Sequence, residues 1–405
     1  MVTRRPRLAL FVDRLTQGGV QHSFVGLANA FVDHGFGVDL VVGDRCNWHD
    51  HDLAEPIETF VLHSGARTRH IAIEFHERLI AKAAMDRKSI RALPIRWRSF
   101  IPGLARYLMT RRPDTMLSAK TLGNLTALLA HRRAHVATRL VVSERSHLSE
   151  SIQRSRKRWK EARLPSLIHA LYPKADAIVA ISQHVADDLA ATSGLEPESI
   201  TKIHNGLLRA GALDHPPDDH PWFDDDRPVI LAAGRFRRQK DFPMLIRAFA
   251  KLRARRPARL MIIGEGEDRA IMEKLIRELS LRDDVALPGF KPNPFAFMKA
   301  ADLFVMSSTH EGFGNVLVEA LAAGCPVVST DCPAGPFEIL DGGRYGKLVP
   351  VGDEDAMANA IEATLDHPPA PDLLRSRASE FSLDRTVDSY LACLLPDRLD
   401  HSTAA

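Results

Sequence analysis

The chain has 405 residues, of which 45% are hydrophobic and 26% charged, and its formal net charge is +3. This length exceeds one hydrophobic core and suits two domains, while the composition is that of a soluble globular protein and excludes a disordered or fibrous chain. The small net charge does not by itself indicate a nucleic-acid partner. The four cysteines have no metal-ligand or paired spacing, so we expect reduced thiols in a cytosolic protein.

The first half of the chain has the pattern of a doubly wound α/β domain. Residues 8–12 form a continuous apolar run, which is typical of a parallel strand covered on both faces and is too short for a signal peptide or a membrane span. Gly18 and Gly19 open a turn before a helical pattern, and residues 38–42 form a second strand, which predicts a βαβ unit. Further strands are predicted at residues 58–62, 115–117, 140–142, 177–181 and 200–203.

Two segments of this half are rich in arginine and lysine and poor in acids. Residues 71–112 interleave these cations with apolar and aromatic side chains, and residues 154–163 surround Trp159. Cationic segments with such aromatics suit an anionic membrane surface, and a solvated helix face explains the pattern equally well. No nucleic-acid-binding motif accompanies the charge, so we expect no nucleic-acid partner.

Polar residues follow two of the predicted strands at their carboxyl ends, where doubly wound domains bind ligands. The candidate ligand-binding residues are Lys120, Thr121, Asn124, Glu144 and Arg145. For Glu144 and Arg145, an ion pair that braces the loop is an equally good account. After the last strand of this half, Ser182 is in the right place to be a helix N-cap.

A polar linker is predicted at residues 207–227, which are rich in proline and aspartate. Asp224, Asp225 and Asp226 are spaced like a metal-binding group of acids. They precede a strand instead of following one, so we interpret them as solvated loop carboxylates and predict no metal site.

The second half, residues 228–380, repeats the strand and glycine-turn pattern. The apolar run 229–233 is followed by a loop that carries Arg235 and Lys240, two cations placed to meet an anionic ligand, although surface charge without a role is the alternative. Two more such turns follow, after residues 260–263 and after residues 285–287. They contain Gly264 and Phe290.

The most informative stretch covers residues 307–330. It follows a predicted strand, turns through Gly312 and Gly314, and continues as a helix with Glu311 before it and Glu319 within it. A helix that starts at the carboxyl edge of a sheet presents backbone N–H groups that bind phosphate. Carboxylates are good acceptors for sugar hydroxyls, so the stretch suits a ligand with both groups.

This stretch resembles the donor-binding signature of glycosyltransferase family 4, because Gly-Phe-Gly lies between the two glutamates and Ala-Ala-Gly-Cys-Pro-Val-Val follows them. The resemblance covers nearly the whole chain and is strongest from residue 228 to residue 350. It implies the α/β GT-B fold, in which two doubly wound Rossmann-like domains face each other across a cleft. Residues 1–206 would bind the acceptor and residues 228–380 the nucleotide sugar, and a last helix near residues 381–397 would pack back on the first domain.

The resemblance also implies an activity. It is a retaining, metal-independent transfer of a sugar, without a cofactor, from a nucleotide diphosphate sugar to a hydroxyl group. We expect a UDP-sugar as donor, a saccharide or lipid-linked acceptor of the cell envelope, and a cytoplasmic location, peripheral at the inner face of the membrane. Two alternatives remain. The first is a catalytically silent module that binds a nucleotide sugar or polysaccharide. The second is a nucleotide-sugar epimerase of similar fold, against which stands that the first domain of this chain has no matching pair of acids.

Residue roles follow from the same resemblance. Arg235, Lys240 and Glu311 would be catalytic, with the two cations on the diphosphate and Glu311 on the donor sugar. The implied donor-binding residues are Gly18, Gly19, Arg235, Lys240, Gly264, Phe290, Glu311, Phe313, Gly314, Asn315, Val316 and Glu319. The five polar candidates of the first half would bind the acceptor. Many members have a histidine where this chain has Lys120 or Thr121, so the acceptor side departs from the family pattern.

Overall fold

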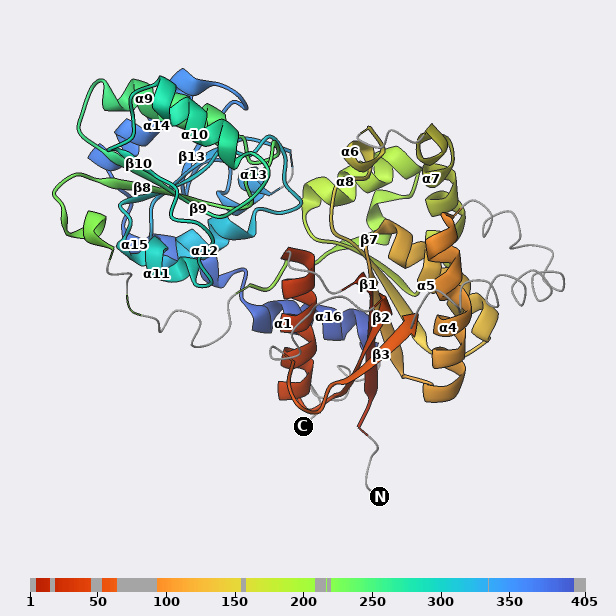
Figure 1. Cartoon of the computed structure of the whole chain (residues 1–405). Coiled ribbons are helices and arrows are strands. Elements are labelled where there is room, and N and C mark those ends of the chain that lie inside the picture. Colours follow the sequence, from red (N-terminus) through yellow and green to blue (C-terminus); the bar gives the residue numbers. More distant parts are fainter. Residues whose placement is uncertain are drawn as a thin grey trace. The chain divides into compact units, whose positions relative to one another are not determined.

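The structure is a computed structural model of the whole chain, and it describes residues 5–14, 19–44, 53–63, 93–153, 158–207, 216, 220–333 and 335–396. The chain divides into two compact units (Figure 1). The first comprises Met1–Gly206 together with Leu383–Ala405, and the second comprises Leu207–Ser382. The chain therefore enters the second unit once and returns to the first unit once.

The first unit is built on a seven-stranded sheet with the strand order β3-β2-β1-β4-β5-β6-β7. All of its strand pairs are parallel. Helices cover both faces, which explains why the strands are continuous apolar runs and confirms the strands predicted for this half. The strands are β1 (Arg7–Arg14), β2 (Gly37–Asp44), β3 (Glu58–His63), β4 (Thr115–Ala119), β5 (Arg139–Glu144), β6 (Ala177–Ala180) and β7 (Ile200–Lys202).

The helices of the first unit lie on both sides of this sheet. They are α1 (Gly19–Asp33), α4 (Ile95–Arg111), α5 (Thr121–Ala134), α6 (Leu148–Gln153), α7 (Arg158–Leu171), α8 (Gln183–Ser193) and α16 (Leu383–Leu394). In Figure 1, α1 and α16 lie on one face of the sheet and α4 and α5 on the other. The hydroxyl of Ser182 accepts a hydrogen bond from the backbone N–H of Val185 at 3.2 Å, so the predicted N-cap of α8 is confirmed.

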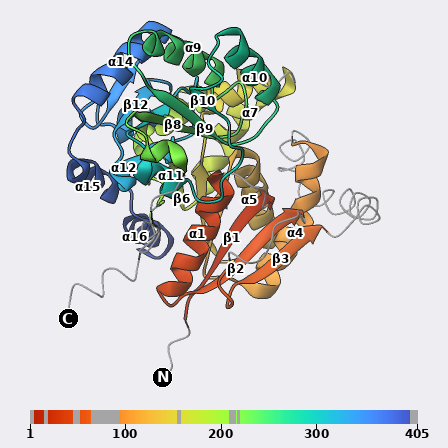
Figure 2. The same ribbon diagram turned by 60° about the vertical axis from the view of Figure 1, so that its left-hand side comes forward.

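The C-terminal helix α16 belongs to the first unit. It lies beside α1 in both views (Figure 2), and the two helices share one hydrophobic core. Val387, Tyr390 and Leu394 are buried in that core. Since residues three and four apart lie on the same side of a helix, these residues form an apolar stripe that returns the chain to the first sheet.

The second unit is built on a six-stranded parallel sheet with the order β10-β9-β8-β11-β12-β13. Its strands are β8 (Val229–Ala233), β9 (Arg259–Ile263), β10 (Val285–Ala286), β11 (Leu303–Met306), β12 (Val327–Thr330) and β13 (Lys347–Val349). Strand β13 was not predicted from the sequence. It has three residues, of which Val349 alone is buried, and so short a run gives no pattern.

Helices also cover both faces of the second sheet. They are α9 (Phe242–Arg253), α10 (Arg269–Glu278), α11 (Pro294–Ala300), α12 (Asn315–Ala323), α13 (Pro336–Ile339), α14 (Glu354–Asp366) and α15 (Pro371–Ser379). Figure 1 shows α9, α10 and α14 over one face and α11, α12 and α15 over the other. Helix α12 is the predicted helix of the glutamate motif, and it packs against α15.

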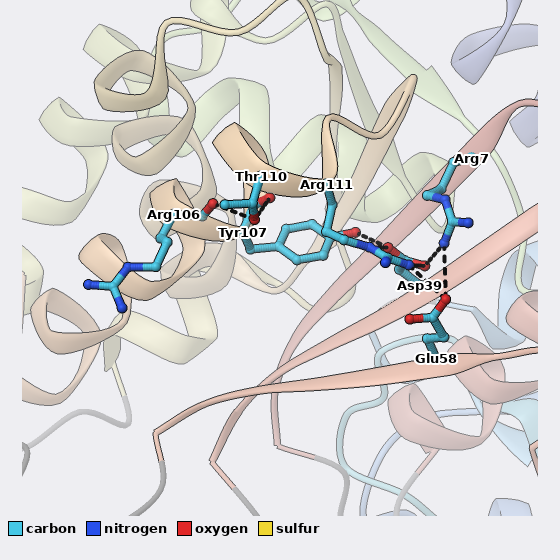
Figure 3. A network of polar contacts seen from close by, with 7 residues as sticks. All are labelled: Arg7, Asp39, Glu58, Arg106, Tyr107, Thr110 and Arg111. Carbon is cyan, nitrogen blue, oxygen red and sulfur yellow. Dashed lines mark hydrogen bonds and ion pairs between the residues drawn. The ribbon is translucent and has the colours of Figure 1, made fainter.

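A charged network fastens three strands of the first unit to α4 (Figure 3). The carboxylate of Asp39 on β2 is fully buried, and it accepts hydrogen bonds from Arg7 at 2.5 Å, Tyr107 at 2.7 Å and Arg111 at 3.2 Å. Arg111 also donates to Glu58 at 2.8 Å. Burial and the neighbouring Asp39 raise the pKa of Tyr107 well above its usual value. Several donors offset the cost of burying this charge, so the network is structural.

The last residues of the predicted linker contact the second unit through ion pairs and an aromatic ring. The carboxylate of Asp225 is 2.9 Å from Arg227 and 2.5 Å from Arg259, whose guanidinium lies 4.8 Å from the ring centre of Trp222. Hydrogen bonds from Arg227 lower the pKa of Asp225 to about 2. Asp224 and Asp226 are exposed, as expected of solvated loop carboxylates, while Asp225 stays partly exposed and also pairs with two arginines.

Candidate functional site

The carboxyl edge of the second sheet is a tightly packed set of glycine turns. The backbone N–H of Gly234, after β8, donates to the carbonyl of Ile263 at 3.0 Å, and that of Gly264, after β9, donates to Gly289 at 2.9 Å. A Cβ atom on Gly264 would lie only 1.9 Å from the carbonyl oxygen of Gly234, and the φ angle of Gly264 is +143°. Only glycine fits there, so the three loops are held together as one surface.

The loop after β8 carries the two predicted cations. Arg235 is exposed, and Lys240 is partly buried. The methylene groups of Lys240 lie over Gly234, where an added Cβ would come within 3.0 Å of its Cε. Asp241 then caps α9, with its carboxylate accepting from the backbone N–H of Met244 at 3.4 Å.

Lys240 and Glu311 form an ion pair across two loops. The Nζ atom of Lys240 lies 2.7 Å from Oε1 of Glu311, and their side chains are 17% and 11% exposed. The hydroxyl of Ser308 donates to the same carboxylate oxygen at 2.7 Å. These residues are far apart in the sequence, so the parallel sheet brings the predicted cation and carboxylate together, while Ser308 was not predicted.

Backbone contacts fix the loops that carry this pair. The hydroxyl of Ser307 donates to the carbonyl of Lys240 at 2.7 Å, and the backbone N–H of Thr309 donates to Gln239 at 2.8 Å. In return, the side-chain amide of Gln239 donates to the carbonyl of His310 at 2.9 Å. The charged groups are thus preorganised on two loops that support each other.

The glycine turn before α12 packs closely against the backbone of Gly335. Gly314 has a φ of +96° and precedes the helix, whose first turn holds no acidic residue. Gly335 approaches this turn so closely that a Cβ on it would lie 1.5 Å from the carbonyl oxygen of Phe313. The first helical residues, Asn315 and Val316, are partly exposed. A helix start whose first turn holds no acid favours an anionic ligand.

Glu319 lies close to the same charges. It is partly buried, and this burial raises its pKa from 4.5 to about 7, while the charge of Lys240 acts in the opposite direction. Its carboxyl group is therefore close to its titration midpoint at neutral pH. A hydroxyl-rich ligand that donates to it would stabilise the ionised form.

Phe290 is the most exposed large apolar residue here. Its side chain is 67% exposed, and it follows Gly289, whose φ of +84° turns the loop. The ring of Phe313, in contrast, is buried, so this residue can offer a ligand only its backbone. The structure therefore brings together most of the predicted donor-binding residues on one edge of one sheet.

In the first unit, some of the predicted ligand-binding residues are partly exposed and others are buried. Gly18 lies outside the described residues, and Gly19 begins α1. Lys120 precedes α5 with a φ of +68°, which is unusual for a residue with a side chain. Its Nζ atom is 3.3 Å from the carboxylate of Asp13, at the end of β1. Asp13 follows the apolar run of β1 directly, a position that could have marked it from the sequence.

Glu144 and Asn124 belong to a buried network behind this edge. Glu144 accepts hydrogen bonds from Thr121 at 3.0 Å, from Asn124 at 3.3 Å and from the hydroxyl of Tyr172. The side chain of Asn124 also accepts from Ser118 at 2.8 Å. Burial raises the pKa of Glu144 to about 7, although its hydrogen bonds act against this rise.

Arg145 is buried in a second network. It donates to Ser23 at 3.1 Å, to Asn205 and to Tyr390 at 3.5 Å, and its guanidinium lies 4.9 Å from the ring centre of Phe24. Burial lowers its pKa.

The prediction that Asn124, Glu144 and Arg145 contact an acceptor is therefore corrected. All three are buried and engaged with the protein. They support the loops, while Lys120 and Thr121 remain partly exposed.

The cationic segments are only partly described. Residues 71–92 and 154–157 lie outside the described residues. In the described part, Arg96 pairs with Asp44 at 3.2 Å, and Arg111 pairs with Asp39 and Glu58, so these cations are already neutralised. Among the helices that the structure describes, none is both long and apolar enough to cross a membrane.

Among the residues that the structure describes, no three side chains of histidine, cysteine, aspartate or glutamate come together in a way that could hold a metal ion. The loop after β8 brings two cations of its own to this edge, Lys240 and Arg235.

Comparison with known proteins agrees with this geometry. Residues 18–206 match a family described as the glycosyl transferase 4-like domain, and residues 219–381 match glycosyl transferases group 1. A Campylobacter jejuni protein, N-acetylgalactosamine-N,N'-diacetylbacillosaminyl-diphospho-undecaprenol 4-alpha-N-acetylgalactosaminyltransferase, is 32% identical over 60% of this chain and 64% of its own length. The lipopolysaccharide core biosynthesis glycosyltransferase LpsE of Rhizobium meliloti is 33% identical over 55% of this chain and 65% of its own length. The matched region thus spans just under two thirds of these relatives.

Solved structures share the fold over nearly the whole chain. The lipopolysaccharide outer core galactosyltransferase WaaB has a TM-score of 0.72 at 18% identity, covering 96% of this chain and 99% of that one. Anabaena Alr3699/HepE, solved with UDP and glucose, has a TM-score of 0.73 at 18% identity, with the same coverage. The expected GT-B class of two Rossmann-like α/β domains is confirmed. Together with the two family matches, this shows that the chain belongs to the family-4 type of glycosyltransferases.

Proposed function

We propose that this protein is a retaining glycosyltransferase that moves a sugar from a nucleotide diphosphate sugar to an acceptor hydroxyl. The observation that carries the proposal is the ion pair of Lys240 and Glu311 at 2.7 Å, set among glycine turns at the carboxyl edge of the second sheet. That edge offers a cation for a diphosphate and carboxylates for sugar hydroxyls within one surface.

The charges of the second unit support this chemistry. When the bond between the sugar and the diphosphate breaks, negative charge grows on the diphosphate, and Lys240 and Arg235 would stabilise it. Glu311 would then accept hydrogen bonds from the donor sugar, and Glu319 from the ribose. Phe290 would stack on the base. The backbone of Gly264, Phe313 and Gly314 and the N–H groups of Asn315 and Val316 would complete the donor site.

The proposed transfer proceeds with retention of configuration. The acceptor oxygen forms a bond to the anomeric carbon on the face from which the diphosphate leaves, and a phosphate oxygen takes the acceptor's proton. The leaving nucleoside diphosphate keeps the electron pair of the broken bond. Lys120 and Thr121, supported by Asp13 and Glu144, would orient the acceptor.

The substrate class is proposed from the relatives. The Campylobacter relative is named for a diphospho-undecaprenol substrate, and the Rhizobium relative for lipopolysaccharide core synthesis. One fold neighbour was solved with UDP-glucose. We infer a UDP-sugar donor and a saccharide or lipid-linked acceptor of the cell envelope, with the enzyme in the cytoplasm or peripheral at the inner membrane face.

One experiment separates this activity from the alternative of a silent nucleotide-sugar-binding module. The purified protein is incubated with radiolabelled UDP-sugars and a membrane lipid extract, with and without EDTA. We expect UDP release matched by a labelled lipid-linked product, unchanged by EDTA, because the proposed site uses protein cations. Binding without turnover would support the silent module, and loss of activity in EDTA would contradict metal independence.

A further inference from the structure

The glycine turn that carries the donor loop has a single side-chain anchor. Of the turn residues between Glu311 and α12, only Phe313 has a side chain, because Gly312 and Gly314 flank it. Its ring is 2% exposed and packs against the ring of Phe381, which is 1% exposed. The ring centres are 5.7 Å apart and the rings are inclined at 63°, a favourable edge-on arrangement.

Phe381 is itself held by Arg377, in the last turn of α15. The guanidinium of Arg377 lies 5.0 Å from the ring centre of Phe381. It donates to the carbonyls of Glu338 at 2.6 Å and Ile339 at 2.9 Å, at the end of α13. Because Gly335, at the start of that segment, presses on the backbone of Phe313, the turn is enclosed on two sides.

Phe381 also lies where the chain leaves the second unit. Its carbonyl accepts a hydrogen bond from the backbone N–H of Leu207 at 3.2 Å, and Leu207 is the first residue of that unit. The segments by which the chain enters and leaves the unit therefore meet at Phe381. The same residue contacts the turn that positions Glu311.

We propose that Phe381 is a positioning residue for the nucleotide-sugar donor. Through Phe313 it sets the turn that places the Glu311 carboxylate and the first N–H groups of α12, and Arg377 locks its ring in place. The proposal rests on the proposed function for its ligand, but the geometry of the turn exists without one. Phe381 touches no reacting atom in this account.

The test compares Phe381→Leu with a matched control, Phe249→Leu. Phe249 is fully buried in the core that α9 forms with the second sheet, and neither Phe313 nor Phe381 belongs to that core cluster. Both variants lose a buried ring, so both should melt at a lower temperature than wild type. We expect hydrogen–deuterium exchange at residues 311–318 to rise in Phe381→Leu and to stay at the wild-type level in Phe249→Leu.

Donor affinity, measured by calorimetry with UDP and with UDP-glucose, gives the functional readout. We expect Kd to rise about tenfold in Phe381→Leu and to change less than about twofold in Phe249→Leu. The double variant Phe313→Leu/Phe381→Leu should bind no worse than either single variant, because both remove one contact.

Unchanged exchange and unchanged Kd in Phe381→Leu would overturn the positioning role. If wild type bound no UDP-sugar, the proposed donor would be wrong, and the exchange measurement would still decide the role of Phe381.

Discussion

The carboxyl edges of the two sheets are built from similar βα turns but differ in how many of their charged side chains are buried. In the second unit, Lys240 and Glu311 form an ion pair, and Arg235, on the same loop as Lys240, is exposed. In the first unit, Glu144 and Arg145 are buried and bonded to the protein. The fold thus offers the same edge twice. Both edges hold a partly exposed ion pair, Lys240 with Glu311 and Lys120 with Asp13, and the first edge has a buried charged network behind its pair.

The largest effect is expected where that difference is greatest. Lys240→Ala should lower kcat about 1,000-fold, a loss on the order of 4 kcal/mol in transition-state stabilisation, because it removes the cation proposed to stabilise the leaving diphosphate. The matched control is Lys251→Ala, since Lys251 pairs with Glu354 and Asp355 on the α9 surface. Its kcat should stay within about twofold of wild type. A kcat of Lys240→Ala close to that of wild type would show that Lys240 does not take part in catalysis.

Glycine packing should be the next most sensitive feature of the second edge. Gly264→Ala should destabilise the protein by about 3 kcal/mol or more, because its Cβ would lie 1.9 Å from the carbonyl oxygen of Gly234. Gly26→Ala, in helix α1 of the first unit, meets nothing within 4 Å. It should be neutral or stabilising by about 0.5–1 kcal/mol. Urea unfolding measures both, and equal effects would show that the turns are not closely packed.

Glu319 should make the donor affinity of the second unit depend on pH. Glu319→Ala should weaken UDP-sugar binding by about 1–3 kcal/mol, because the proposed contacts with the ribose hydroxyls are lost. Since burial raises the pKa of this group to about 7, wild-type donor affinity should rise as pH increases through 7. Glu319→Gln should show no such rise. Calorimetry between pH 6 and pH 8 checks both, and a UDP-sugar is used because its diphosphate does not titrate there.

The same shift has a consequence for stability. The folded state binds the proton of Glu319 more tightly than the unfolded state, so this group lowers the free energy of unfolding progressively as pH rises from 4.5 to about 7. Glu319→Gln should therefore flatten the pH profile of stability in that window. An identical profile in wild type and variant would contradict the assigned burial of this carboxyl group.

The smallest effect is expected at the first edge. Lys120→Ala should lower kcat/KM for the acceptor about tenfold and leave donor Kd unchanged, because its amino group lies 3.3 Å from Asp13 in the unit proposed to bind the acceptor.

Arg145→Lys should mainly lower Tm, because Arg145 bonds to Ser23, Asn205 and Tyr390. Loss of donor binding in either variant would mean that the first unit also contacts the donor.

The sequence predicted the strands and the second edge well for a physical reason. Continuous apolar runs identify buried parallel strands, and residues after such strands meet at one edge of a sheet, which places Lys240 and Glu311 together although 71 positions separate them. It could not show that Asn124, Glu144 and Arg145 point inward, because a polar residue after a strand can bond to the protein or face solvent. The contacts of Ser308, Gly335 and Phe381 depend on tertiary packing and leave no pattern in the sequence.

The most direct test is calorimetric titration of wild type and Lys240→Ala with uridine, UMP and UDP. If Lys240 and its loop bind the diphosphate, wild-type affinity should increase from uridine to UMP to UDP, and Lys240→Ala should lose most of the gain between UMP and UDP. Equal affinity of wild type for uridine and UDP, or an unchanged gain in Lys240→Ala, would contradict the account.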